Sequence, residues 1–244
     1  MSENQRVELE PVFLLHRRAF RESSAIVEVF SQNHGRLAMV ARGANRPRST
    51  LRAALTPFAP LLMSWSGRGE LATLRAVEAA TSPNILVGKA LLSGMYLNEL
   101  LMRLTHRHDP HPELFVAYNS AIVDLSSAGT LEQTLRIFEK RILESIGYAL
   151  ILECEMDDGA TVLAGEQYRY IADRGPTRDP RLASSFVEVS GKTLLSLATE
   201  QPLSACGQRE AKRLMRFLLA AHLGGRPLAS RELFRKWETA NDRQ

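Results

Sequence analysis

The sequence predicts an α+β protein in which a small β-domain precedes a mainly helical one. Short segments rich in valine, isoleucine and phenylalanine alternate with turns over residues 7–80, which is typical of strands. Apolar residues recur at helical spacing after Pro83. A stretch at about 151–189 contains several glycines and prolines and has neither period. We therefore expect a β-domain at 1–82, and a helical domain at 83–244 that includes a small irregular subdomain.

Five strands are expected in the first domain. They are Val7–Leu15, Ser24–Ser31, Arg36–Arg42, Phe58–Ser66 and Leu71–Ala80. Tight turns separate two pairs of them, with Gly35 able to take positive φ in the first turn. A sheet this small must protect its edges, and closure into a barrel is the usual solution. An OB-type barrel is therefore expected, although a small sandwich would give the same periodicity.

The later segments predict helices and one short hairpin. Helices are expected at Lys89–Arg103, Pro112–Leu125, Thr130 to about Gly147, Lys192–Thr199, Gln208–Leu223 and from Ser230 onward. Thr130 to Gln133 resembles a capping box, which marks the start of a helix. A hairpin is expected around Thr161–Ile171 in the irregular stretch. Residues 50–55, in the long connection between the third and fourth strands, could form a helical turn.

Positive charge is concentrated in the first third of the chain. Residues 1–80 carry 11 arginines, no lysine and 7 acidic residues, whereas residues 81–244 carry 20 basic and 20 acidic residues. No acidic residue lies between Glu28 and Glu70, and the basic residues in that interval are Arg36, Arg42, Arg46, Arg48, Arg52 and Arg68. A long interval of one sign is typical of a surface that binds a polyanion, although a solvated basic loop would have the same composition.

These six arginines are the candidate nucleic-acid contacts. Arginine pairs with phosphate through two parallel hydrogen bonds and can stack on bases, so an all-arginine surface suits a single strand. Arg46, Arg48 and Arg52 fall in a loop, whereas Arg36 and Arg42 lie at strand ends. Candidate stacking residues are few, and at strand spacing they favour the core; they are Phe20, Phe30, Phe58 and Trp65.

Three motifs that suggest other chemistry are weak. The segment His106 to His111 (HRHDPH) has metal-ligand composition, but its spacing favours a loop between helices. Gly191-Lys192-Thr193 lacks the glycine that a phosphate loop needs five residues earlier, since Phe186 is there. No nucleophile elbow or carboxylate pair is evident. We therefore expect no catalytic residues, no cofactor and no small-molecule substrate.

The compartment is expected to be the cytoplasm, near the nucleoid. Cys154 and Cys206 are the only cysteines and are far apart, so no disulfide framework is indicated. The polar N-terminus lacks the apolar core of a signal peptide, and no apolar run is long enough to span a bilayer. No membrane partner is expected.

Five segments, taken in order, resemble the RecO family of recombination mediators in its proteobacterial form. They are Arg42–Leu62, Gly67–Glu70, Tyr96–Leu101 (YLNELL), Leu135–Tyr148 and Gly224–Phe234. The resemblance implies an OB-fold, a helical domain, and a subdomain that holds zinc in many relatives. It also implies binding of single-stranded DNA, strand annealing, help in loading RecA, and RecR and the single-strand binding protein SSB as partners. Double-stranded DNA is a second candidate ligand.

The resemblance also directs attention to zinc and to the SSB tail. Zinc-binding relatives carry paired CxxC segments, whereas this chain has no CxxC and only Cys154 in that region, so we expect no metal. A pocket for the acidic, phenylalanine-ended SSB tail is implied in the helical domain. The candidate residues are Arg136, Lys140, Arg141 and Lys192. The alternative is that the third predicted helix is simply amphipathic, with a polar face exposed to solvent. The cluster of Arg209, Lys212, Arg213 and Arg216 would extend the DNA track or simply keep its helix soluble.

The sequence thus predicts a stoichiometric mediator that binds single-stranded DNA and anneals strands. Two other functions stay open. An RNA-binding OB protein would have the same electrostatics, and a metal-dependent hydrolase could be built on the histidine-rich segment.

Overall fold

In the computed structural model, residues 6–67, 69–127, 131–179, 181 and 185–241 are described. By their contacts they form two units, 1–128 with 228–244, and 129–227. The predicted boundary at residue 82 falls between the last strand of the barrel and the first long helix, inside the first unit. The helices that directly follow the barrel, up to residue 128, belong to that unit because they pack on the barrel. None of the helices in the described ranges is long and apolar enough to cross a membrane.

The first unit begins with a closed five-stranded barrel, in which the strands follow the order β1-β2-β3-β5-β4. The strands are β1 (Arg6–Phe20), β2 (Ser24–Ser31), β3 (Gly35–Ala41), β4 (Pro60–Ser66) and β5 (Leu71–Ala79), with the short helix α1 (Thr50–Ala54) between β3 and β4. The fold class and the barrel predicted from the sequence are confirmed. The parallel pairing of β3 with β5, from Ala38 opposite Leu71 to Val40 opposite Thr73, closes the ring.

Strand β1 is longer than predicted because it serves two neighbours. Its first half pairs with β4, from Arg6 to Phe13, and its second half pairs with β2, from Val12 to Phe20. The register shifts between Leu14 and His16, where the strand bends around the barrel. Such irregularities increase local twist and allow a small sheet to close. Alternate side chains fill the interior, including Val27, Met39 and Trp65.

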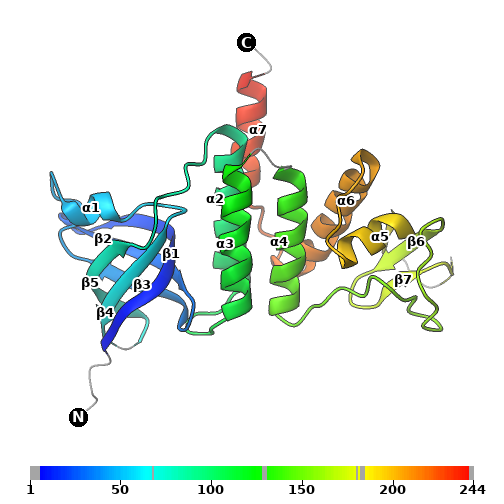
Figure 1. Cartoon of the computed structure of the whole chain (residues 1–244), viewed down its shortest axis with the longest axis horizontal. Helices are drawn as coiled ribbons and strands as arrows, with labels where there is room; N and C mark the ends of the chain where they lie inside the picture. Colours follow the sequence, from blue (N-terminus) through cyan, green and yellow to red (C-terminus); the bar gives the residue numbers. More distant parts are fainter. Residues whose placement is uncertain (1–5, 68, 128–130, 180, 182–184, 242–244) are drawn as a thin grey trace. The chain divides into compact units, whose positions relative to one another are not determined.

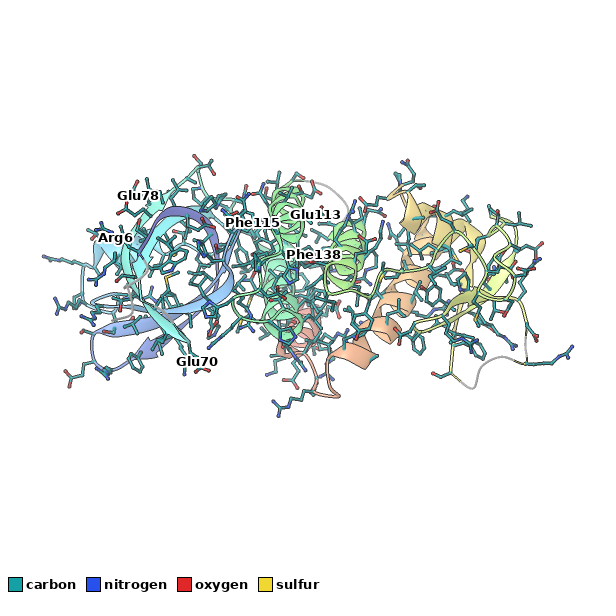
Figure 2. The ribbon with its side chains drawn as sticks, turned by 90° about the horizontal axis from the view of Figure 1, so that it is seen from below. Arg6, Glu70, Glu78, Glu113, Phe115 and Phe138 are labelled. Atoms are coloured by element: carbon teal, nitrogen blue, oxygen red, sulfur yellow. The ribbon has the colours of Figure 1, made fainter. Side chains whose placement is uncertain are left out.

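Three helices complete the first unit: α2 (Gly88–Leu104), α3 (Pro112–Ser126) and α7 (Ala229–Asn241). Phe115 of α3 lies on the side of its helix that faces the barrel (Figure 2). Its ring is 5.1 Å from that of Phe13 and 5.7 Å from that of Phe30, both in the barrel. Asn98 of α2 donates to the carbonyl of Leu15 at 2.9 Å. Aromatic packing and a buried hydrogen bond therefore hold the helices on β1.

Helix α7 is fixed at its first turn. The carboxylate of Glu99 accepts hydrogen bonds from the backbone N–H groups of Ala229 and Ser230, each at 2.9 Å, and from the Ser230 hydroxyl at 2.6 Å. These are donors that a helix leaves unsatisfied at its N-terminus. The chain thus returns to the first unit after residue 227.

The second unit combines helices with a three-stranded sheet (Figure 1). Its elements are α4 (Leu131–Ser145), β6 (Gln167–Ile171), β7 (Gly175–Thr177), β8 (Val187–Ser190), α5 (Gly191–Ala198) and α6 (Ala205–His222). The strand order is β7-β6-β8. The capping box predicted at Thr130 lies outside the described residues. The hairpin lies later than predicted, because Thr161 forms only an isolated bridge with Cys154, whereas β6 turns directly into β7.

Candidate nucleic-acid interface

Two connections of the barrel lie side by side at one of its ends. The backbone N–H of Asn45 donates to the carbonyl of Ser23 at 2.9 Å, and its side-chain amide donates to the carbonyl of Ser24 at 2.6 Å. Arg17 of β1 donates to the carbonyl of Ala44 at 2.9 Å and to the Asn45 side-chain oxygen at 2.8 Å. These bonds attach the loop after β3 to the β1–β2 hairpin.

The loop itself is a series of tight turns that ends in α1. The N–H of Arg46 donates to the carbonyl of Gly43, and that of Ser49 to the carbonyl of Arg46. Arg48 adopts a positive φ of 60°, which is uncommon for a residue with a side chain. The hydroxyl of Ser49 accepts from the N–H of Arg52 at 3.3 Å and caps α1. A loop organised in this way holds its arginines in defined positions.

Six exposed arginines lie on these two connections or next to them in sequence, and we call them the arginine surface. They are Arg18 and Arg21 from the β1–β2 hairpin, and Arg42, Arg46, Arg48 and Arg52 from the loop and α1. Within the described ranges, none of them lies within ion-pair distance of an acidic side chain. Burial lowers the pKa of Arg17, and the positive charge of Arg52 lowers it further. The charges of these six arginines are therefore not neutralised by ion pairs within the described ranges, and Glu22 is an exposed carboxylate next to Arg21.

Four of the six arginines predicted from the sequence thus belong to one surface, whereas Arg36 does not. Arg36 is partly buried, with its guanidinium 3.4 Å from Glu28 and donating to the Thr105 carbonyl at 3.0 Å. Burial lowers the pKa of Arg36, and the Glu28 carboxylate offsets part of that change. The contacts of Arg36 therefore join the barrel to the connection between α2 and α3. Arg68 lies outside the described residues.

The arginines of the hairpin were missed by the sequence analysis. Arg18 and Arg21 precede Glu28 and therefore lie outside the acid-free interval from which the six candidates come. The available signal was the local excess of arginine in RRAFR, at residues 17–21. The hydrogen bonds of Asn45 attach the hairpin that carries these arginines to the loop that carries the others.

The four candidate stacking residues also differ in how far they are buried. Phe30, Phe58 and Trp65 are buried, as the strand pattern favours. Phe20 is only partly buried at the β1–β2 turn, and the guanidinium of Arg21 lies 5.1 Å from the centre of its ring. Phe20 is thus the one of these four aromatic rings that lies beside the arginine surface.

The histidine-rich segment packs on the barrel. Arg107 forms an ion pair with Glu28, and the N–H of His108 donates to the carbonyl of Arg36 at 2.9 Å. A Cβ atom at Gly35 would lie 2.2 Å from the carbonyl oxygen of Asp109, and Gly35 has the positive φ that its turn predicted. The described residues contain no group of three or more side chains placed to hold a metal. These contacts give the segment a structural role at the barrel.

The irregular part of the second unit does not offer the ligands of a structural zinc. Cys154 is exposed and has no second cysteine near it in sequence. The buried carboxylate of Glu155 pairs instead with Arg178 at 2.7 Å, and Thr177 donates to Asp157. Both contacts join the loop that follows Cys154 to β7 and the residues after it. These residues therefore do not offer the four ligands of a structural zinc, and an ion pair and a hydrogen bond link them instead.

The four candidates for the SSB tail differ in exposure. Arg136 is buried and pairs with Glu139 at 2.8 Å, and Lys140 is buried and donates to the carbonyl of Leu197 at 3.1 Å. Arg141 is exposed and pairs with Glu200 at 2.7 Å, and Lys192 is exposed on α5. The structure therefore does not gather them into one exposed basic rim.

Comparison with known proteins places the chain in a family. The family model described as "Recombination protein O N terminal" matches residues 7–83, and "Recombination protein O C terminal" matches residues 87–232. Proteins named DNA repair protein RecO are similar along almost their whole length. The relative from Nitrosospira multiformis is 44% identical, covering 97% of this chain and 98% of its own. The relative from Methylococcus capsulatus is 47% identical, covering 94% of each chain. The chain therefore belongs to the RecO family.

Proposed function

We propose that this chain is a cytoplasmic, non-enzymatic DNA repair and recombination mediator that binds single-stranded DNA through the arginine surface. The observation that carries the proposal is the set of six exposed arginines without acidic partners at one end of an OB barrel. Membership of the RecO family supports DNA as the ligand. Guanidinium groups on a preformed loop would neutralise backbone phosphates and release their counterions. Binding should therefore tolerate any sequence and weaken steeply with salt.

The test is a titration of fluorescent single-stranded DNA across a salt series. The variant carries Arg46→Gln, Arg48→Gln and Arg52→Gln. Each phosphate contact in single-stranded DNA contributes about 0.7 to the slope of log affinity against log salt. We expect affinity to fall at least tenfold and the slope to fall by about 2.

The matched control removes the same charge from α7, with Arg231→Gln, Arg235→Gln and Lys236→Gln. It should bind as the parent protein does. Equal affinity and slope in the loop variant and the parent would overturn the proposal. Competition by RNA of the same sequence tests the alternative function, RNA binding, since an RNA-binding protein would prefer the RNA competitor.

We further propose RecR and the SSB tail as protein partners, on the basis of the family resemblance. The second unit offers a hollow of about 200 Å³, lined by Tyr148, Ile151, Arg174 and other residues. It supplies apolar surface beside a basic side chain, which a phenylalanine-ended acidic tail requires. Arg174→Ala should weaken binding of an SSB tail peptide, measured by anisotropy, more than the buried-site change Arg136→Ala. The reverse order would favour the α4 site predicted from the sequence.

A further inference from the structure

Helix α6 has one buried face and one strongly basic face. Its buried residues include Ala211, Leu214 and Leu218, which lie on the inner side of the second unit. The opposite side carries four long basic side chains, all exposed, which we call the α6 stripe: Arg209, Lys212, Arg213 and Arg216. Steps of three and four residues place these positions in one row along the helix. In Figure 1, α6 lies beside α5 in this unit.

In the described part of the chain, no acidic side chain neutralises the positive charge of this stripe through an ion pair. The one acidic residue of α6, Glu210, is on the buried face and accepts hydrogen bonds from Ser190 and Thr193, each at 2.6 Å. Within the described ranges, none of the four basic side chains lies within ion-pair distance of a carboxylate.

The charge of the second unit is unevenly distributed. Residues 129–200 hold 8 basic and 12 acidic residues, whereas residues 201–227 hold 5 basic and 1 acidic. A unit with no net charge has therefore collected its excess positive charge on and near one helix. Segregation of this kind attracts an anionic partner rather than only improving solubility.

The shape of the stripe fits a phosphate backbone. Seven residues at 1.5 Å per residue spread the charges over about 10 Å. This length matches about three successive phosphates at the duplex spacing of about 3.4 Å per nucleotide. Exposed alanines flank the stripe at Ala205 and Ala220. The α6 residues that line the apolar hollow of this unit, Leu218 and His222, are not among the four stripe positions, so the stripe itself offers charge rather than an apolar pocket. A phosphate backbone therefore fits the stripe better than a peptide that ends in an aromatic residue.

We propose that the α6 stripe is a second nucleic-acid-binding surface, separate from the arginine surface of the barrel. This inference rests on the proposed function and deepens it. Each unit of the chain then holds its own phosphate-binding surface, so a single molecule can hold two strands at once. Bringing two strands together on one protein raises their effective concentration for each other. The α6 stripe would therefore serve strand annealing more than the binding of one strand.

The chain contains a probe for this surface. Cys206 and Cys154 are both exposed, and Cys206 lies on α6 three residues before Arg209. A Cys154→Ser protein is labelled at Cys206 with an environment-sensitive dye, and a Cys206→Ser protein is labelled at Cys154. Single-stranded oligonucleotide is then added beyond the amount that saturates the barrel. We expect the Cys206 dye to respond and the Cys154 dye to stay constant.

Annealing kinetics provide the second measurement. The stripe variant carries Arg209→Gln, Lys212→Gln, Arg213→Gln and Arg216→Gln. Its annealing rate for complementary strands should fall at least tenfold, whereas its affinity for one strand should change less than threefold. The matched control removes four charges from the barrel, with Arg42→Gln, Arg46→Gln, Arg48→Gln and Arg52→Gln. That control should lose single-strand affinity and still show a Cys206 response at high DNA concentration.

The outcomes separate the two proposals. A silent Cys206 dye together with normal annealing by the stripe variant overturns the α6 surface and leaves the arginine surface intact. Normal single-strand binding by the barrel control overturns the arginine surface instead. A Cys206 dye that responds to an acidic peptide, and not to DNA, also overturns the α6 proposal. The dye experiment uses α6 with its basic residues intact, so it does not depend on how the stripe variant folds.

Discussion

At the scale of single residues, Arg17 differs from the arginines around it. Its guanidinium donates to the Ala44 carbonyl and to the Asn45 side-chain oxygen, at 2.9 and 2.8 Å, so it holds the loop in position. Nothing in its sequence context distinguishes it from Arg18, because both lie in the same run of strand residues. The difference arises from strand alternation, which directs neighbouring side chains to opposite faces.

We expect Arg17→Met to loosen the loop while the barrel stays folded. The apolar stem of the side chain is kept and two hydrogen bonds are lost, each with a net contribution of about 1 kcal/mol. Trypsin should then cleave after Arg48 several times faster, and single-strand affinity should fall several-fold. Cleavage rates followed by mass spectrometry give the first measurement.

Arg18→Met is the matched control. It should lower affinity through a lost contact and leave the cleavage rate unchanged. If Arg17→Met is cut at the parental rate, the positioning role assigned to Arg17 is wrong.

At the scale of elements, the start of α5 depends on a carboxylate of α6. Glu210 accepts from the Ser190 hydroxyl and from the Thr193 hydroxyl, and Ser190 in turn caps α5. Burial by itself would raise the pKa of Glu210, but hydrogen bonds from Ser190 and Thr193 outweigh it, so the pKa lies below its usual value of 4.5. The folded state therefore favours the charged carboxylate.

This shift predicts how stability depends on pH. Because the pKa is lower in the folded state, the contribution of Glu210 is fully present above about pH 4.5 and is lost as pH falls through the folded value. Glu210→Gln should lower the free energy of unfolding by about 1–3 kcal/mol at pH 7, since buried donors lose a charged acceptor. The variant should also lose less stability than the parent below pH 4.5.

Thermal unfolding between pH 3 and pH 7 is the measurement. Glu188→Gln is the control, because Glu188 is an exposed carboxyl on β8. If the unfolding temperatures of Glu210→Gln and the parent decline in parallel over that range, the stabilising role of the Glu210 carboxylate is wrong.

At the scale of the whole molecule, a short buried network joins the barrel to its helices. The hydroxyl of Tyr118 on α3 donates to the Asn98 side-chain oxygen at 2.5 Å, and Asn98 donates to the Leu15 carbonyl of β1. Asn98 and Glu99 both belong to the YLNELL segment that carried part of the family resemblance. That segment therefore organises the first unit, through the barrel on one side and α7 on the other.

Tyr118→Phe should destabilise the first unit without changing DNA binding. Tyr118 is fully buried, and removal of its hydroxyl leaves the Asn98 oxygen without that donor. The free energy of unfolding should fall by about 1–3 kcal/mol. Urea unfolding should show the loss, and affinity for single-stranded DNA should stay within twofold. Tyr148→Phe, at a tyrosine that is 47% exposed, should leave stability unchanged. A weakened DNA affinity in Tyr118→Phe would show that the helices also shape the arginine surface.

Much of the fold could be predicted from local patterns. Period-two segments, the turn at Gly35 and the change to helical period after Pro83 are properties of neighbouring residues, so they predicted five strands and the later helices. The length of β1 and the position of the β6–β7 hairpin could not be predicted in this way. Both depend on which distant strand offers a partner, as when β1 pairs with β4 and then with β2.

The sequence by itself predicted the class of ligand, because an acid-free interval of arginines is typical of a surface that binds a polyanion. Only the tertiary structure decided which arginines remain exposed. Arg36 contacts Glu28 and Thr105, whereas Arg18 and Arg21 stay exposed on the hairpin to which the loop is bonded. The physical reason is that net charge is a sum over the sequence. Whether a given arginine side chain stays exposed depends on burial and on partners that are distant in sequence.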